Sequence, residues 1–194
     1  MPTILLVRHG ETHWNREKRI QGHGDSPLTL KGIEQAKAYG RTLAGLIGDV
    51  AGWRVIASPL PRCVQTAAIL CEVAGLDFTT IAFEDRLKEI STGQWAGRLK
   101  AEMDPAELTG SGLDSWFFRC PGGETHAQVS ARLSHWLAER VGGEKLVVVG
   151  HGVSGRILRG LHAKINPDEA PCGESPQDVV FRLRAGRIER IACI

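Results

Sequence analysis

The chain has 194 residues, of which 42% are hydrophobic and 24% are charged. These proportions are typical of a soluble globular protein, and the length suits one domain with a substantial core, so we expect a single domain over residues 1–194. The formal net charge of +2 gives no reason to expect nucleic acid or an anionic membrane as a partner. No apolar stretch approaches the length needed to span a bilayer.

The cysteines indicate the redox compartment. There are five, an odd number, and no two of them form a C-x-x-C pair. This pattern favours reduced thiols over a disulfide framework or a zinc site. The N-terminal residues also lack a basic segment followed by a long apolar region, so we expect no cleavable secretion signal and a cytoplasmic enzyme.

The first half of the chain predicts three strands and two helices. An apolar run predicts a strand over residues 3–8, and a helix is expected from Thr29, a suitable N-cap, to about residue 47. A second strand is predicted over 54–57. It is followed by a helix over residues 60–74 that carries Pro61 in its first turn. Residues 79–83 predict a third strand.

The second half is regular only after residue 122. Residues 97–122 show no clear periodicity. A helix is predicted over 125–141, a strand over 145–149 and a helix over 153–162, and residues 179–191 predict a hairpin at the edge of the sheet. Strands separated by helices favour an α/β fold. We expect a three-layer α/β/α sandwich whose central sheet is mostly parallel, with an antiparallel edge strand.

Two histidine–glycine pairs each follow an apolar strand. His9 and Gly10 follow the strand at residues 3–8, and His151 and Gly152 follow the strand at 145–149. Continuous Val, Ile and Leu without alternation is typical of parallel strands covered on both faces. Ligands bind such sheets at the carboxyl ends of the strands, so we expect the two imidazoles to converge on one cleft.

Charged residues at the same predicted sheet edge favour an anionic substrate. Arg8 immediately precedes His9, and Arg62 lies just past the second strand. Guanidinium groups donate paired hydrogen bonds to phosphate or carboxylate oxygens. A neutral imidazole can attack phosphorus, and Glu89, after the third strand, can protonate a leaving alkoxide. Two arginines and a second histidine can neutralise a transferred phosphoryl group without a metal.

These residues lie in segments that together resemble the histidine phosphatase superfamily, also called phosphoglycerate-mutase-like. Cys63 stands where that pattern usually has alanine. The resemblance covers nearly the whole chain through six segments that occur in the expected order: RHGETHWN at 8–15, GDSPLT at 24–29 with Gly32, SPLPRCVQTA at 58–67, LKEISTGQWAG at 87–97, PGGET at 121–125, and GHG at 150–152.

The resemblance implies a role for each matching residue. His9 would be the nucleophile that becomes phosphohistidine, and Glu89 would protonate the leaving group and then activate water. The resemblance implies neither a metal nor another cofactor. The remaining groups would contact the phosphoryl oxygens, and they are Arg8, Arg62, His151, Asn15 and the backbone amide of Gly152.

The resemblance leaves three functions open. Mutases of this kind carry a tyrosine just after the glutamate, together with extra basic residues. Here residues 90–95 contain no tyrosine, and Arg119 is the only arginine between residues 100 and 125. Val153 also stands where mutases place asparagine. We therefore favour a metal-independent phosphomonoesterase acting on a small-molecule phosphate ester, over a phosphoglycerate mutase. A non-catalytic phospho-ligand binder would lack at least one of the residues His9, Arg62, Glu89 and His151, and all four are present.

The aromatic run Trp116–Phe118 has two interpretations. Contiguous aromatic side chains usually pack in a core, because they rarely stay exposed without cause. Alternatively, one or two of them lie over the mouth of the cleft and select apolar leaving groups, because long irregular segments near clefts are often functional. The other five histidines are expected to be surface or packing residues, and a binding role stays open for His13 and His23, which lie near the predicted cleft by sequence.

Overall fold

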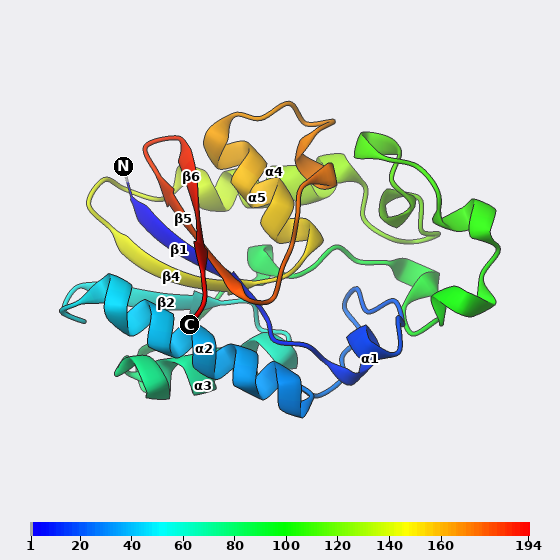
Figure 1. Cartoon of the computed structure of the whole chain (residues 1–194). Coiled ribbons are helices and arrows are strands. Elements are labelled where there is room, and N and C mark those ends of the chain that lie inside the picture. The colour runs from blue at the N-terminus through cyan, green and yellow to red at the C-terminus, as the bar shows by residue number, and fades with distance from the viewer. Residues whose placement is uncertain (1) are drawn as a thin grey trace.

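The computed structural model describes residues 2–194, and a six-stranded sheet in the order β3-β2-β4-β1-β5-β6 lies at its centre (Figure 1). The pairs β1–β4, β2–β4 and β2–β3 are parallel, whereas β5 and β6 are antiparallel. This confirms the mostly parallel sheet with an antiparallel edge. The strands are β1 (Thr3–Arg8), β2 (Trp53–Ala57), β3 (Ala82–Phe83), β4 (Lys145–Gly150), β5 (Val179–Arg184) and β6 (Arg187–Ala192).

Two helices cover each face of the sheet (Figure 1). On one face lie α2 (Leu30–Ile47) and α3 (Pro61–Ala74), and on the other lie α4 (His126–Ala138) and α5 (Val153–Ala163). Alternate residues of the central strands enter opposite layers. Leu5 and Val7 of β1, for example, pack towards α2 and α3, whereas Ile4 and Leu6 pack towards α4 and α5. The expected three-layer sandwich is therefore present.

Most element boundaries agree with the predictions, and the differences have local causes. Residues 78–80 form a 3-10 turn instead of the start of a strand, because the Asp77 carboxylate accepts the Thr79 amide 2.8 Å away. The third strand is consequently reduced to β3. A short helix, α1 (His13–Arg16), was not predicted, and a capping box between Thr12 and Asn15 stabilises it.

The segment 97–122 folds as successive 3-10 turns beyond the carboxyl ends of β1 and β4 (green in Figure 1). Met103, Phe117 and Cys120 anchor it by burial. The 3-10 turns of the described chain are Phe78–Thr80, Asp85–Leu87, Gly93–Trp95, Lys100–Glu102, Pro105–Leu108, Gly112–Asp114, Trp116–Phe118 and Ala170–Cys172. None of the helices found in residues 2–194 has the length and apolarity to cross a membrane.

Candidate active site

The register of the parallel strands brings the two histidines together. Arg8 of β1 pairs with Gly150 of β4, so the next residue of each strand, His9 and His151, leaves the sheet at the same point. The two ring centroids lie 5.3 Å apart with the planes at 63°, and each residue is only 2% exposed. The structure thus places both imidazoles in one buried site.

His9 is held with one ring nitrogen available. Its Nδ1 lies 2.8 Å from the Gly10 carbonyl oxygen, and this carbonyl accepts only an N–H, so Nδ1 carries the proton and Nε2 carries a lone pair. Burial, followed by the charges of Arg62 and Arg8, lowers the pKa of His9 well below its ordinary value. The ring is therefore neutral, as a nucleophile must be.

His151 is fixed by groups that follow β2. Its Nε2 lies 2.7 Å from the Ser58 hydroxyl oxygen, and the Cys63 sulfur lies 3.4 Å from the same nitrogen. Burial is the largest cause that lowers the pKa of His151 well below its ordinary value, and Arg62 is the next. This second imidazole is also neutral in the free protein. Ser58 stands first in the predicted arginine segment, but its contact with His151 was not foreseen.

Arg62 is completely buried at the start of α3. Its Nη1 donates to the Asp25 carboxylate and to the Gly24 carbonyl, both at 2.8 Å, and its Nη2 donates to the Gly22 carbonyl at 2.8 Å. The Nε–H is buried and has no partner in the part of the chain that the structure describes. A buried cation with an unsatisfied donor is costly, so this guanidinium is set up to receive an anion.

Arg8, the residue before His9, resembles Arg62 in its contacts. Its Nη1 donates to the Ser175 carbonyl oxygen at 2.6 Å, and its buried Nε–H has no partner within residues 2–194. Burial lowers the pKa of Arg8, although Glu89 raises it. Two guanidinium groups beside the neutral His9 can together hold the oxygens of one phosphoryl group.

Glu89 lies on the N-terminus of α5. Its carboxylate accepts the backbone N–H groups of Gly152 and Val153 at 3.0 Å and of Ser154 at 2.9 Å. The positive end of the helix dipole favours a negative group here. The Gly152 amide, expected to contact the phosphoryl oxygens, therefore donates to Glu89 in this structure.

The backbone of Glu89 is held by side chains from two other parts of the chain. Its carbonyl oxygen accepts from His23 Nε2 at 2.8 Å and from Arg132 Nη2 at 3.1 Å. Arg132 of α4 is itself held by Glu124, whose carboxylate also accepts the Ser91 amide at 2.8 Å. His23, for which the sequence left both a packing and a binding role open, thus supports the loop that presents Glu89.

A hollow of about 150 Å³ lies beside Arg8, His9, Arg62 and Glu89, whereas His151 and Gly152 are not among the residues that line it. Trp116 and Phe117 line it, and Phe117 is also part of the core next to α4 and α5. Trp116 and Phe117 thus wall the hollow, and Phe118 packs against the core, whereas selection of apolar leaving groups by this run stays a prediction. The lining residues are Arg8, His9, Asn15, Arg19, Ile20, Gln21, Gly22, Arg62, Glu89, Ile90, Thr92, Lys100, Trp116, Phe117 and Val153.

Lys100 is a lining residue that the sequence analysis missed. Its ammonium lies 4.6 Å from the centre of the Trp116 ring. Burial is the largest cause lowering its pKa, and the charges of Arg156 and Arg8 add to it. No carboxylate pairs with it among the described residues. Because residues 97–122 lack periodicity, no local pattern marked this position.

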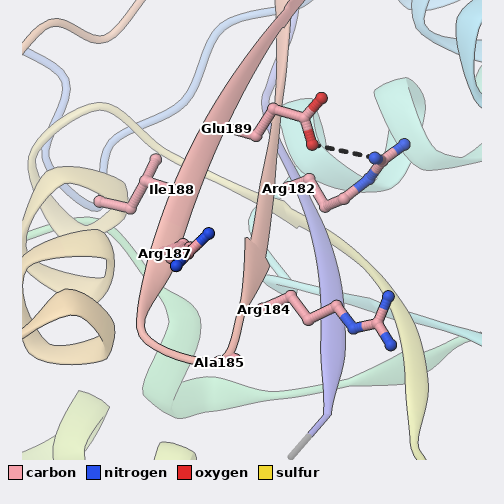
Figure 2. Close-up of a pocket in the computed structure, with 6 residues that line it drawn as sticks. All are labelled: Arg182, Arg184, Ala185, Arg187, Ile188 and Glu189. Atoms are coloured by element: carbon pink, nitrogen blue, oxygen red, sulfur yellow. Dashed lines mark hydrogen bonds and ion pairs between the residues drawn. The ribbon is translucent and has the colours of Figure 1, made fainter.

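A second hollow, of about 680 Å³, lies at the other end of the sheet, around the turn between β5 and β6 (Figure 2). Arg184 there pairs in register with Thr3, at the start of β1, so this hollow is remote from His9. An ion pair of 2.9 Å joins Arg182 to Glu189. Its lining includes neither a histidine nor another nucleophile, so it is not the candidate active site.

Comparison with known families agrees with this geometry. The profile of the histidine phosphatase superfamily (branch 1) matches residues 4–171. The chain belongs to the histidine phosphatase superfamily. Its members are enzymes, phosphatases or mutases, that act on small phosphorylated substrates.

Relatives in this superfamily carry both kinds of name. A probable phosphoglycerate mutase GpmB of Salmonella paratyphi C is 36% identical over 163 residues, covering 79% of this chain and 71% of that protein. Among solved structures, a mycobacterial glucosyl-3-phosphoglycerate phosphatase with VO3 superposes with a TM-score of 0.80 at 26% identity, covering 99% of both chains. Bacillus stearothermophilus YhfR has a TM-score of 0.78 at 27% identity, covering 99% of this chain and 96% of its own.

Proposed function

We propose that this histidine phosphatase superfamily member is a metal-independent phosphomonoesterase that works through a phosphohistidine at His9. The observation that carries the proposal is the neutral His9 ring close to the guanidinium groups of Arg8 and Arg62, each of which has a buried Nε–H with no partner among the described residues. A phosphoryl group bound there would satisfy both donors and lie next to the nucleophilic nitrogen.

In the first step, the lone pair of His9 Nε2 forms a bond to phosphorus while the bond between phosphorus and the ester oxygen breaks. Arg8, Arg62 and His151 stabilise the charge on the phosphoryl oxygens. The leaving oxygen takes a proton from Glu89, whose carboxyl group is the only one among the residues that line the hollow in the described chain. Glu89 must therefore enter this step protonated, although three backbone N–H groups favour its carboxylate, and the negative charge of the bound phosphoryl group offsets that preference.

In the second step, water attacks the phosphohistidine. Glu89, now ionised, accepts a proton from that water as its oxygen bonds to phosphorus. The bond from phosphorus to Nε2 breaks, and His9 returns to its neutral form with inorganic phosphate as product. The same carboxyl group therefore gives a proton in one step and regains it in the next.

A mutase is the second candidate, because of Lys100. This cation lines the same hollow as Arg8 and Arg62 and has no carboxylate partner in the described chain, which suits a substrate with a second anionic group. The relatives named phosphoglycerate mutase also point in this direction. The absence of a tyrosine at residues 90–95 and the presence of Val153 still favour hydrolysis.

The test is hydrolysis of para-nitrophenyl phosphate in the presence of a chelator. We expect turnover by the wild type, and we expect His9→Ala to reduce kcat by at least about 1,000-fold, because the nucleophile is removed. His135→Ala, at an exposed histidine of α4, is the matched control and should retain full activity. Undiminished hydrolysis in His9→Ala contradicts the proposal. Conversion of 3-phosphoglycerate with a bisphosphate primer, without net phosphate release, would favour the mutase.

A further inference from the structure

The chain between the last 3-10 turn and β5 lies against the active site. Three arginines donate to three successive carbonyl groups of this connection: Arg156 to Gly173 at 3.2 Å, Arg159 to Glu174, and Arg8 to Ser175 at 2.6 Å. Two of these arginines come from α5, and the third is the arginine next to His9. The connection is therefore fixed in place, although it has no regular secondary structure and lies outside the residues matched by the family profile.

Gln177, in this connection, donates to two atoms of the nucleophile region. Its Nε2 lies 3.0 Å from the His9 carbonyl oxygen and 3.2 Å from the Asn15 Oδ1. A backbone carbonyl only accepts hydrogen bonds, so the NH2 end of the Gln177 amide must face His9. The second hydrogen of the same NH2 group then serves Asn15.

This contact determines which way the Asn15 amide is turned. Asn15 Oδ1 also accepts the Thr12 backbone N–H at 3.2 Å, as part of the capping box of α1. Two donors thus converge on Oδ1 and hold the oxygen away from the hollow. Because Asn15 lines the hollow, its own NH2 group is left to donate into it.

We propose that Gln177 is a positioning residue for the phosphoryl site. It locks the Asn15 amide with its NH2 towards the phosphoryl oxygens and fixes the backbone of His9 at the same time. The inference rests on the proposed function, because it assumes that an anion occupies the hollow. Gln177 itself does not line the hollow, so it acts through Asn15 and His9.

The decisive substitution is Gln177→Glu, which keeps the shape of the side chain. A carboxylate cannot donate to the His9 carbonyl, and it repels Asn15 Oδ1, so the Asn15 amide should turn its oxygen into the hollow. Misplacement of a group that orients the reacting atoms is costly. We expect kcat/KM for para-nitrophenyl phosphate to fall about 10- to 100-fold and the Kd of tungstate, a phosphate analogue, to rise about 5- to 10-fold.

A double-mutant cycle separates positioning from general structural support. Gln177→Ala and Asn15→Ala are measured singly and together, with Gln94→Ala, at an exposed glutamine, as the control that should leave kcat/KM unchanged. If Gln177 acts through Asn15, the loss in the double variant is smaller than the product of the single losses, by at least about threefold. Thermal unfolding of each variant reports whether it is folded.

The result that overturns the inference is full additivity in the cycle, or wild-type activity and tungstate affinity in Gln177→Glu. The experiments distinguish failure of the proposed function from failure of the positioning role of Gln177. If the wild type does not hydrolyse phosphate esters, the proposed function fails. If the wild type hydrolyses them and the Gln177 variants behave like Gln94→Ala, only the positioning role fails. A variant that does not fold is replaced by Gln177→Met, which keeps the volume and lacks the donor, with the same expectations.

Discussion

His9 and His151 are neutral because their surroundings are cationic and buried. Burial is the largest cause that lowers each pKa, and Arg62 and Arg8 lower both further. The same two guanidinium groups would hold the phosphoryl oxygens in the proposed reaction. One set of charges thus keeps the nucleophile deprotonated and also prepares the site for an anion.

The neutral histidines predict how stability depends on pH. The unfolded chain binds protons at these rings as the pH falls through about 6.5, but the folded chain does not, so the free energy of unfolding decreases on acidification. Each ring contributes at most about 1.4 kcal/mol per pH unit below about 6.5. Thermal unfolding between pH 7.5 and 5.5 should show a falling Tm in the wild type and a smaller fall in His9→Gln. An equal fall in both proteins argues against a buried, neutral His9.

The candidate catalytic residues could be predicted from the sequence, but the residues that hold them in place could not. His9, His151, Arg8, Arg62 and Glu89 follow predicted strands, so their convergence follows from parallel pairing. Supporting residues such as Ser58, His23 and Gln177 act through contacts with residues far away in the chain, and no local pattern marks such contacts.

Among the elements, α2 is packed unusually closely against the loop that carries the nucleophile. A Cβ on Gly32 would lie 2.1 Å from the Glu11 carbonyl oxygen, and a Cβ on Gly10 would lie 2.3 Å from the Gly32 carbonyl oxygen. The two glycines therefore allow backbone-to-backbone contact beside His9. In the sequence, Gly32 stood out only as part of the segment that follows GDSPLT, and nothing local indicated its packing role.

Two substitutions in α2 test this contact. Gly32→Ala should destabilise the protein by about 1–3 kcal/mol and reduce activity, because the helix must move away from the loop after β1. Gly45→Ala in the same helix has no atom within 4 Å of the added Cβ, so it should stabilise by about 0.5–1 kcal/mol with unchanged activity. Chemical denaturation and kcat/KM measure both effects. Equal behaviour of the two variants would show that the close contact is unimportant.

A helix or strand could be predicted where the local sequence pattern determines it, and not where long-range contacts do. The strands β1 and β4 are continuous Val, Ile and Leu runs, and α2 begins at the N-cap predicted for it. Residues 97–122 instead follow long-range contacts, such as Arg19 Nη1 to the Gly97 carbonyl at 2.6 Å. The sequence therefore identified the layers of the fold but not the path of the segment that walls the hollow.

For the molecule as a whole, the near-zero net charge conceals a concentrated cationic site. The formal charge is only +2, yet Arg8, Arg62 and Lys100 line one small hollow together with a single carboxyl group. Acidic residues elsewhere, such as the Glu139 that pairs with Arg86, balance the total. Overall charge thus excluded nucleic acid as an expected partner while giving no information on the affinity of the site for a small anion.

An anion that fills this site should stabilise the whole fold. Binding to the folded state alone at 100 times the Kd adds about 2.7 kcal/mol, which corresponds to a rise in Tm of about 5–10 °C for a chain of this size. We expect tungstate to produce this rise in the wild type and a much smaller one in Arg62→Ala. An equal rise in the two proteins would place the anion elsewhere, for example at the arginines near the β5–β6 turn.

The most direct test of the account is to trap the phosphorylated enzyme during turnover. Enzyme mixed with para-nitrophenyl phosphate is quenched in alkali, which preserves phosphohistidine, and is then digested and analysed by mass spectrometry. The account predicts one phosphoryl group on His9 that is lost on mild acid treatment and is missing in His9→Ala. Active wild-type enzyme with a phosphoryl group on another residue, or with none throughout steady-state turnover and single-turnover sampling, would contradict it.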